Sequence, residues 1–159
     1  YKPISKYTSS IDSTHKKITI QTAWTPGSTY FYILPKEAVQ DSTGNFLNKS
    51  DTIRFNTKNQ TDYGNVTLRF SNLDLTRNPV IQFTDGETVK FSFPLKSVEW
   101  TNNRFPPGEY AIRILYDKNN NGTWDPGNYT QKTQPEKVLS LDMKLAIKAD
   151  WDNERDIKL

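Results

Sequence analysis

The sequence predicts an all-β fold, built as an antiparallel β-sandwich. Apolar and polar residues alternate with a period of two in several short segments, which is typical of strands that bury one face. Turn-forming pairs such as Pro26-Gly27 and Asp85-Gly86 separate these segments. Strands joined by short turns pair as antiparallel sheets, and two such sheets bury their apolar faces against each other.

Each predicted strand places its apolar side chains on alternate positions, so that one face can be buried. The predicted strands are 18–24, 30–34, 53–55, 66–70, 89–95, 110–116 and 145–151. Helix candidates are scarce. They are Pro35 to Val39 and Leu95 to Trp100, and both are shorter than a helix that is stable on its own.

A polar segment, residues 56–65, lacks any apolar period and indicates a boundary between two modules. We expect a first module over residues 1–60 and a second over residues 61–159. The second is long enough to close its own sandwich, whereas the first has few strands for one. We therefore expect the first module to be part of a longer domain.

Composition narrows the function classes. The absence of cysteine rules out a disulfide scaffold, a thiol nucleophile and a thiolate zinc site. The formal charge of +3 is small and its basic residues are dispersed, so we expect no nucleic-acid partner. No apolar run approaches the ~20 residues of a membrane-spanning helix, and we expect any export signal to lie outside this sequence.

Residues 117–128 have the oxygen spacing of a calcium-binding loop. Oxygen-bearing side chains occupy loop positions 1, 3, 5, 9 and 12, and glycine occupies position 6. The candidate metal ligands are side-chain oxygens of Asp117, Asn119, Asn121, Asp125 and Asn128 and the backbone carbonyl of Thr123. Because the loop follows a predicted strand, we expect it to be set into a β-domain and not between two helices.

Two interpretations of this loop stay open. In the first, it binds calcium, with a Kd of about 10⁻⁴–10⁻³ M because Asn128 offers one neutral oxygen where strong sites have a bidentate carboxylate. In the second, it is a plain connection in which the asparagines form Asx turns and Gly122 adopts a positive φ. Both interpretations fit the composition.

Catalytic chemistry has few candidates. His15 is the only histidine and lies beside Lys16 and Lys17, so we expect it at the surface and outside any Ser-His-Asp arrangement. The acidic tail, Asp150 to Asp156, contains carboxylates of the kind that glycosidases use in pairs. Such clusters are usually solvated, and we expect no enzymatic activity.

The four tryptophans raise a carbohydrate-binding alternative, since exposed rings can stack on sugars. Trp24 and Trp151 fall on strand positions that we expect to point inward, as aromatic residues in small sandwiches often do. Trp100 and Trp124 lie near predicted turns and are the better surface candidates. In the calcium loop, Trp124 is expected to be a packing residue.

Several motifs resemble a known family. Residues 30–35, 38–45 and 51–57 are similar to the C-terminal half of a bacterial Ig-like domain of the S-layer-protein type, in which a strand, a D-x-x-G-N turn and a closing F-x-T strand follow in this order. The segments 62–65, 107–117 and 134–137 resemble the small Ig-like or prealbumin-like β-sandwich that ends Ig-like-domain envelope lipoproteins of Bacteroidota-type bacteria. The first module lacks the opening strands of that pattern.

The resemblance implies a non-catalytic structural or protein-interaction module of the cell envelope, on an outer-membrane lipoprotein that faces the periplasm or the cell surface. Its partners would be envelope proteins or neighbouring domains of the same chain, and it would reach the membrane only through a lipid anchor outside this sequence. Calcium, in the first of the two interpretations of the loop, is the one candidate cofactor. Two alternatives remain, an accessory module that recognises a glycan or a peptide, and a subunit of a larger envelope complex.

Overall fold

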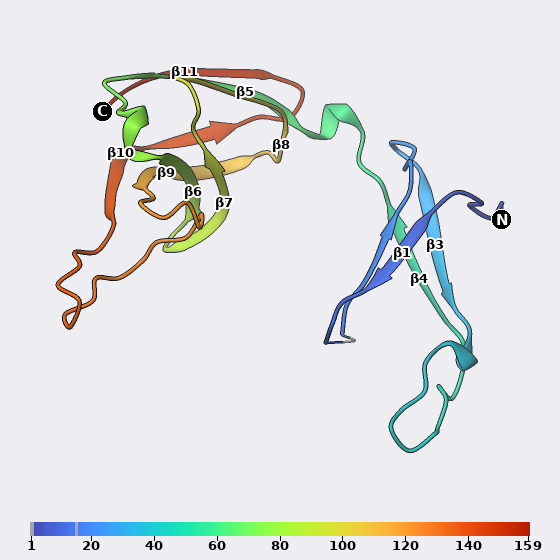
Figure 1. Cartoon of the computed structure of the whole chain (residues 1–159). Coiled ribbons are helices and arrows are strands. Elements are labelled where there is room, and N and C mark those ends of the chain that lie inside the picture. The colour runs from blue at the N-terminus through green and yellow to red at the C-terminus, as the bar shows by residue number, and fades with distance from the viewer. Residues whose placement is uncertain (1, 15) are drawn as a thin grey trace. The chain divides into compact units, whose positions relative to one another are not determined.

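The computed structural model describes residues 2–14 and 16–159, and the chain is all-β, as predicted (Figure 1). It divides into two compact units, Tyr1–Asn59 and Gln60–Leu159. The sequence-based boundary after residue 60 lies next to this division. The expectation for His15 lies outside the described residues.

The elements follow one another as short strands joined by turns. The strands are β1 Thr8–Ile11, β2 Ile18–Gln21, β3 Thr29–Leu34, β4 Asp51–Asn56, β5 Gly64–Ser71, β6 Pro79–Asp85, β7 Thr88–Pro94, β8 Glu99–Phe105, β9 Gly108–Tyr116, β10 Lys137–Ile147 and β11 Asp152–Lys158. The helical segments of the described residues are single 3₁₀ turns, at Lys36–Ala38, Gln60–Asp62 and Leu75–Arg77. Within the described part of the chain, none of the helices is long and apolar enough to cross a membrane.

The first unit consists of two antiparallel hairpins, β1 with β2 and β3 with β4. The ring of Trp24 packs edge-on against Tyr30 at 4.9 Å and Phe55 at 5.4 Å, and the last two rings stack across the β3–β4 pair. No residue described between positions 2 and 59 is buried. This unit is therefore held by strand pairing and ring contacts, without a closed core.

A turn at Asp41 shapes the connection between β3 and β4. One carboxylate oxygen of Asp41 accepts the backbone N–H groups of Thr43 and Asn45, each at 2.9 Å, and also the Thr43 hydroxyl at 2.8 Å. The hydrogen bonds from Asn45 and Thr43 lower the pKa of Asp41 to about 2, because they stabilise the charged form. The D-x-x-G-N motif thus forms a turn around an ionised aspartate.

The second unit has two sheets. One sheet has four antiparallel strands in the order β10-β9-β6-β7, and the other has three strands in the order β11-β5-β8. The polypeptide closes the second sheet by pairing β11, the last strand, in parallel with β5, the first strand of the unit, so the prediction of purely antiparallel sheets is wrong for this pair. Parallel neighbours need a long connection, and here the rest of the unit provides it.

The two sheets of the second unit face each other across one apolar core. Phe83 of β6 is fully buried, and its ring lies 4.5 Å from that of Phe105 and 5.5 Å from that of Trp100 on the opposite sheet. The rest of the core alternates along the strands, and its buried members include Val66, Leu68, Phe70, Ile81, Ile112, Ile114, Leu145, Ile147 and Ile157. The sandwich therefore forms around aromatic contacts between its sheets.

Several sequence-based assignments differ from the structure. The helix candidate Leu95 to Trp100 is irregular up to residue 98 and then enters β8, whereas Pro35 does precede a 3₁₀ turn. The strand predicted over 145–151 ends at Ile147 and belongs to the longer β10. Strands β1, β6, β8 and β11 were not predicted. In β6 both faces are buried, so apolar residues do not alternate with charged ones.

Replacing Phe83 tests the packing between the sheets. We expect Phe83→Ala to lower the free energy of unfolding by about 3–5 kcal/mol, because the cavity would lie between both sheets. Urea denaturation followed by circular dichroism measures this change. Val98→Ala is a control at a side chain that is 52% exposed, and it should change the same quantity by less than about 0.5 kcal/mol. Equal effects of the two substitutions would contradict the described core.

The depressed pKa of Asp41 makes the stability of its turn dependent on pH. Because the folded-state pKa is lowered to about 2, from an ordinary value of about 3.9, the stabilising contribution is present above the ordinary value and is lost as the pH falls through about 2. NMR titration of the Asp41 carboxyl carbon should show this low midpoint. Thr43→Val removes the hydroxyl donor and should raise the midpoint, and an unchanged midpoint would argue against this hydrogen bond.

Candidate functional site

The segment between β9 and β10 is the best candidate for a functional site. It spans residues 117–136 and extends from the sandwich as a long excursion, drawn in orange in Figure 1. Asp117 begins it directly after β9, and its N–H donates to the carbonyl of Asn78, which precedes β6, at 3.2 Å. The start of the loop is therefore fixed to the four-stranded sheet.

The Asp117 carboxylate organises the first turn of the loop. Asp117 is only 1% exposed, and its two oxygens accept the N–H groups of Gly122 at 2.7 Å and Asn121 at 3.3 Å. Gly122 has a φ of +77°, a conformation that side chains with a Cβ rarely adopt. The positive φ predicted for Gly122 is confirmed, and the loop wraps around an aspartate at position 1.

Three further predicted ligands converge on one another. The side-chain amides of Asn119 and Asn121 donate to the same oxygen of Asp125, at 2.7 and 2.8 Å. The amide oxygens meanwhile accept backbone N–H groups two residues ahead, which is the Asx-turn pattern. These three side chains thus form a compact polar cluster.

The remaining two predicted ligands have other partners. Thr123 donates both its backbone N–H and its hydroxyl to the side-chain oxygen of Asn121. Asn128 pairs with Thr133 in a second, separate tight turn, where its side-chain oxygen accepts the N–H of Gln131 at 3.0 Å. The oxygen at loop position 12 is therefore engaged in this neighbouring turn.

Sequence analysis missed Glu136, which closes the loop. Glu136 is 7% exposed, and its carboxylate oxygens accept the backbone N–H of Lys118 at 2.6 Å and of Asp125 at 3.1 Å. Its backbone N–H donates to the Asp125 carbonyl, and its carbonyl accepts the indole N–H of Trp124. In the sequence, Glu136 is only an acidic residue at the end of a polar segment. It lies outside the twelve positions of the calcium-loop pattern, so that pattern could not identify it.

The residues present fit a hard cation in their chemistry. Carboxylate and amide oxygens are the ligands that calcium prefers, and Asn amide groups can rotate to present oxygen in place of nitrogen. Asp117, Asn119, Asn121 and Asp125 would hold the ion, with the carbonyl of Thr123. Within the described residues, no three acidic or histidine side chains are grouped for metal binding. An ion here would therefore depend on neutral oxygens and would bind weakly.

A groove runs alongside the loop. It has a volume of about 690 Å³. The loop contributes Asp117, Asn120, Asn121 and Gly122, and the four-stranded sheet and its connections contribute mainly Leu75, Val80, Pro94, Leu95 and Lys96. The lining is mixed, since apolar side chains from the sheet face polar groups from the loop. The loop conformation thus determines one wall of this groove.

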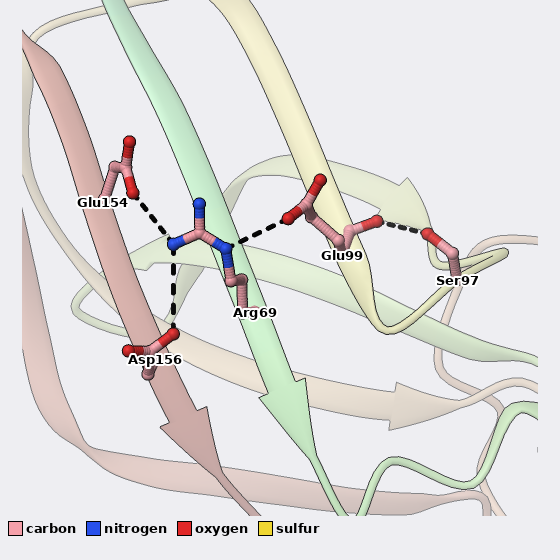
Figure 2. Close-up of polar contacts among 5 residues, drawn as sticks. All are labelled: Arg69, Ser97, Glu99, Glu154 and Asp156. Carbon is pink, nitrogen blue, oxygen red and sulfur yellow. Dashed lines mark hydrogen bonds and ion pairs between the residues drawn. The ribbon is translucent and has the colours of Figure 1, made fainter.

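Two carboxylates of the acidic tail, on Glu154 and Asp156, lie elsewhere, on the exposed face of the three-stranded sheet. Figure 2 shows Arg69 of β5 between Glu99 of β8, at 3.0 Å, and Glu154 and Asp156 of β11, at 2.8 and 4.0 Å. The hydrogen bonds to Glu154 and then to Glu99 raise the pKa of the Arg69 guanidinium. All four side chains are solvent-exposed, and together they form a charge network across three strands. These carboxylates are therefore solvated.

The tryptophan assignments are largely reversed. Trp24 and Trp151, expected to point inward, lie outside the strands and are 38% and 60% exposed. Trp100, expected near the surface, lies on the inner face of β8 and packs against the core. Trp124 is 47% exposed although its indole N–H is bonded to the loop. The errors for Trp24 and Trp151 arose because the predicted strands ran past the ends of β2 and β10, and the error for Trp100 arose because β8 was not predicted.

Comparisons with known proteins add no family assignment, since neither a protein-family model nor a curated protein matches this sequence.

Removing the charge of Glu136 tests its role in closing the loop. Glu136→Gln leaves one of the two backbone N–H groups without an acceptor and weakens the other bond, and we expect a loss of about 1.5–3 kcal/mol in the free energy of unfolding. Amide hydrogen exchange should accelerate at Lys118 and Asp125. Asp142→Asn, at an exposed carboxylate of β10, is the matched control. Unchanged exchange in Glu136→Gln would refute the proposed closure.

Proposed function

We propose that this chain is a non-catalytic structural or protein-interaction module of the cell envelope. The observation that best supports this proposal is that the buried carboxylates of the loop accept hydrogen bonds from the loop's own backbone. Asp117 and Glu136 hold backbone N–H groups of the loop, so the most buried acids stabilise a surface feature. Asp117 also lines the groove beside the loop, but each of its two oxygens accepts a backbone N–H of the loop, so this carboxylate has a structural use.

The envelope location follows from the resemblance of the two modules to Ig-like envelope lipoproteins. Two consecutive β units separated by a short polar segment suit a spacer that holds a partner or a neighbouring domain at a distance. The hydrogen-bonded loop and its groove supply a surface for contact. An envelope protein or a neighbouring domain of the same chain is the partner that we propose.

Calcium is proposed as a stabiliser of the loop. Bound calcium would neutralise Asp117 and Asp125 and would replace the hydrogen bonds that now join the polar cluster. Because the ligands are brought together only in the folded unit, the ion would bind the folded state and stabilise it. The proposed role of the ion is to stabilise the loop, and the ion takes part in no reaction.

Thermal unfolding in calcium tests the stabilising role. At 10 mM free calcium and a Kd of about 10⁻⁴–10⁻³ M, we expect ~1–3 kcal/mol of added stability and a midpoint higher by several degrees. Asp117→Ala should abolish the calcium-dependent increase, whereas Asp142→Ala should retain it. The increase is compared within each variant, because Asp117→Ala also lowers stability without calcium. Identical calcium responses in the two variants would disprove the metal site.

Cross-linking in native membranes, followed by mass spectrometry, tests the wider proposal. The expected result is a reproducible cross-link from the 117–136 loop to an envelope protein or a neighbouring domain. A hydrolytic activity of the purified chain towards a glycan or a peptide would overturn it.

An accessory ligand-binding role is the second candidate, because the groove beside the loop could take a peptide. If the ligand is a glycan, Trp124 and Trp151 are the candidate residues for stacking on it, because both are exposed. Trp100 is not a candidate, because it packs against the core. Glycan binding that is lost in Trp124→Ala or Trp151→Ala would favour this role over that of a spacer.

A further inference from the structure

The loop contains the only Asn-Gly pair of the sequence, Asn121-Gly122. We propose that Asn121 is a site of spontaneous deamidation, in which the backbone nitrogen of Gly122 attacks the side-chain carbonyl carbon of Asn121. The reaction is intramolecular, and the folded loop arranges groups around each of its participants. Other asparagines are followed by residues with a side chain, which hinders the same attack.

Gly122, which carries the nucleophilic nitrogen, is unobstructed on its Cα side, and its N–H has a hydrogen-bond acceptor. A Cβ placed on Gly122 would meet no other atom within 4 Å, so space around this residue is open. The N–H of Gly122 donates to an oxygen of Asp117 at 2.7 Å. This hydrogen bond orients the Gly122 N–H within the loop before the new C–N bond forms.

The electrophile is polarised by two donors. The side-chain oxygen of Asn121 accepts the backbone N–H of Thr123 at 2.8 Å and the Thr123 hydroxyl at 2.9 Å. Negative charge develops on this oxygen when the carbonyl carbon is attacked, and donors already in place stabilise it. The leaving nitrogen of Asn121 is held by Asp125 at 2.8 Å.

The reaction balances with water as the only co-reactant. The Gly122 nitrogen bonds to the side-chain carbon of Asn121, the bond from that carbon to the amide nitrogen breaks, and the proton lost by Gly122 leaves on ammonia. The product is a five-membered succinimide. Water then opens the ring at the side-chain carbonyl to give aspartate, or at the main-chain carbonyl to give isoaspartate.

Formation of aspartate would change the cation chemistry of the loop. It would add a third carboxylate at loop position 5, beside Asp117 and Asp125. Since affinity in such loops rises with the number of charged ligands, the deamidated loop would bind calcium more tightly. This consequence rests on the calcium binding proposed above, whereas the deamidation itself does not.

Peptide mapping by mass spectrometry tests the modification. The purified full chain is incubated at neutral pH, and fragment ions locate any conversion of amide to acid among Asn119, Asn120 and Asn121. We expect conversion at Asn121. Thr123→Val, which removes the hydroxyl donor, should slow it about tenfold, as the loss of one hydrogen bond to the developing charge implies. Thr123→Ser retains the hydroxyl and should restore the rate.

The same chain unfolded in urea provides the reference, because it shows the conversion of Asn121 without the loop structure. If Asn121 converts in urea but stays an amide in the folded protein, the proposal is overturned. Conversion that is equally fast in Thr123→Val and wild type would overturn the assigned role of Thr123.

The Asn121→Asp variant separates the two proposals. Its thermal midpoint should rise more steeply with calcium than that of the wild-type chain. Deamidation without any calcium response in either chain would leave the modification standing and would remove the calcium function. A calcium response without deamidation would support the calcium function and would overturn the proposed modification.

Discussion

Two buried carboxylates, on Asp117 and Glu136, hold the long connection between β9 and β10 in one conformation. A buried charge is tolerated only when hydrogen bonds replace its hydration, and here backbone N–H groups of the loop itself provide them. Any other conformation of the loop would have to provide new hydrogen bonds for these two carboxylates. The polar cluster, the wall of the groove and the arrangement around Asn121 all depend on this constraint.

The sandwich supplies the rigid base to which the loop is fixed. Aromatic side chains fill the space between its sheets, and Phe83 contacts rings on the opposite sheet. The parallel pairing of β11 with β5 joins the end of the unit to its beginning, and Arg69 links the neighbouring strands on the outer face (Figure 2). The residues described in the first unit, 2–14 and 16–59, form no comparable core and are held by hairpin pairing and a few ring contacts.

Periodicity predicted those strands whose two faces differ. The alternation at Val66, Leu68 and Phe70 marks β5, where buried and exposed positions alternate in the structure. Periodicity did not predict β6, because this strand is buried on both faces. It did not predict β8 and β11 either, because their polar sequences form strands only by pairing with neighbours far away in the chain. Such pairing depends on residues far away in the chain, so no local pattern could indicate it.

The sequence by itself determined that the chain is all-β and that an oxygen-rich loop with a glycine at Gly122 follows one strand, because alternation and turn chemistry are local properties. Only the tertiary structure decided which acids hold that loop. Glu136 lies far from Asp117 in sequence and became its counterpart because β9 and β10 are neighbours in one sheet. The parallel closure by β11 and the inward position of Trp100 likewise follow from the packing of two sheets, which sets burial only after both have formed.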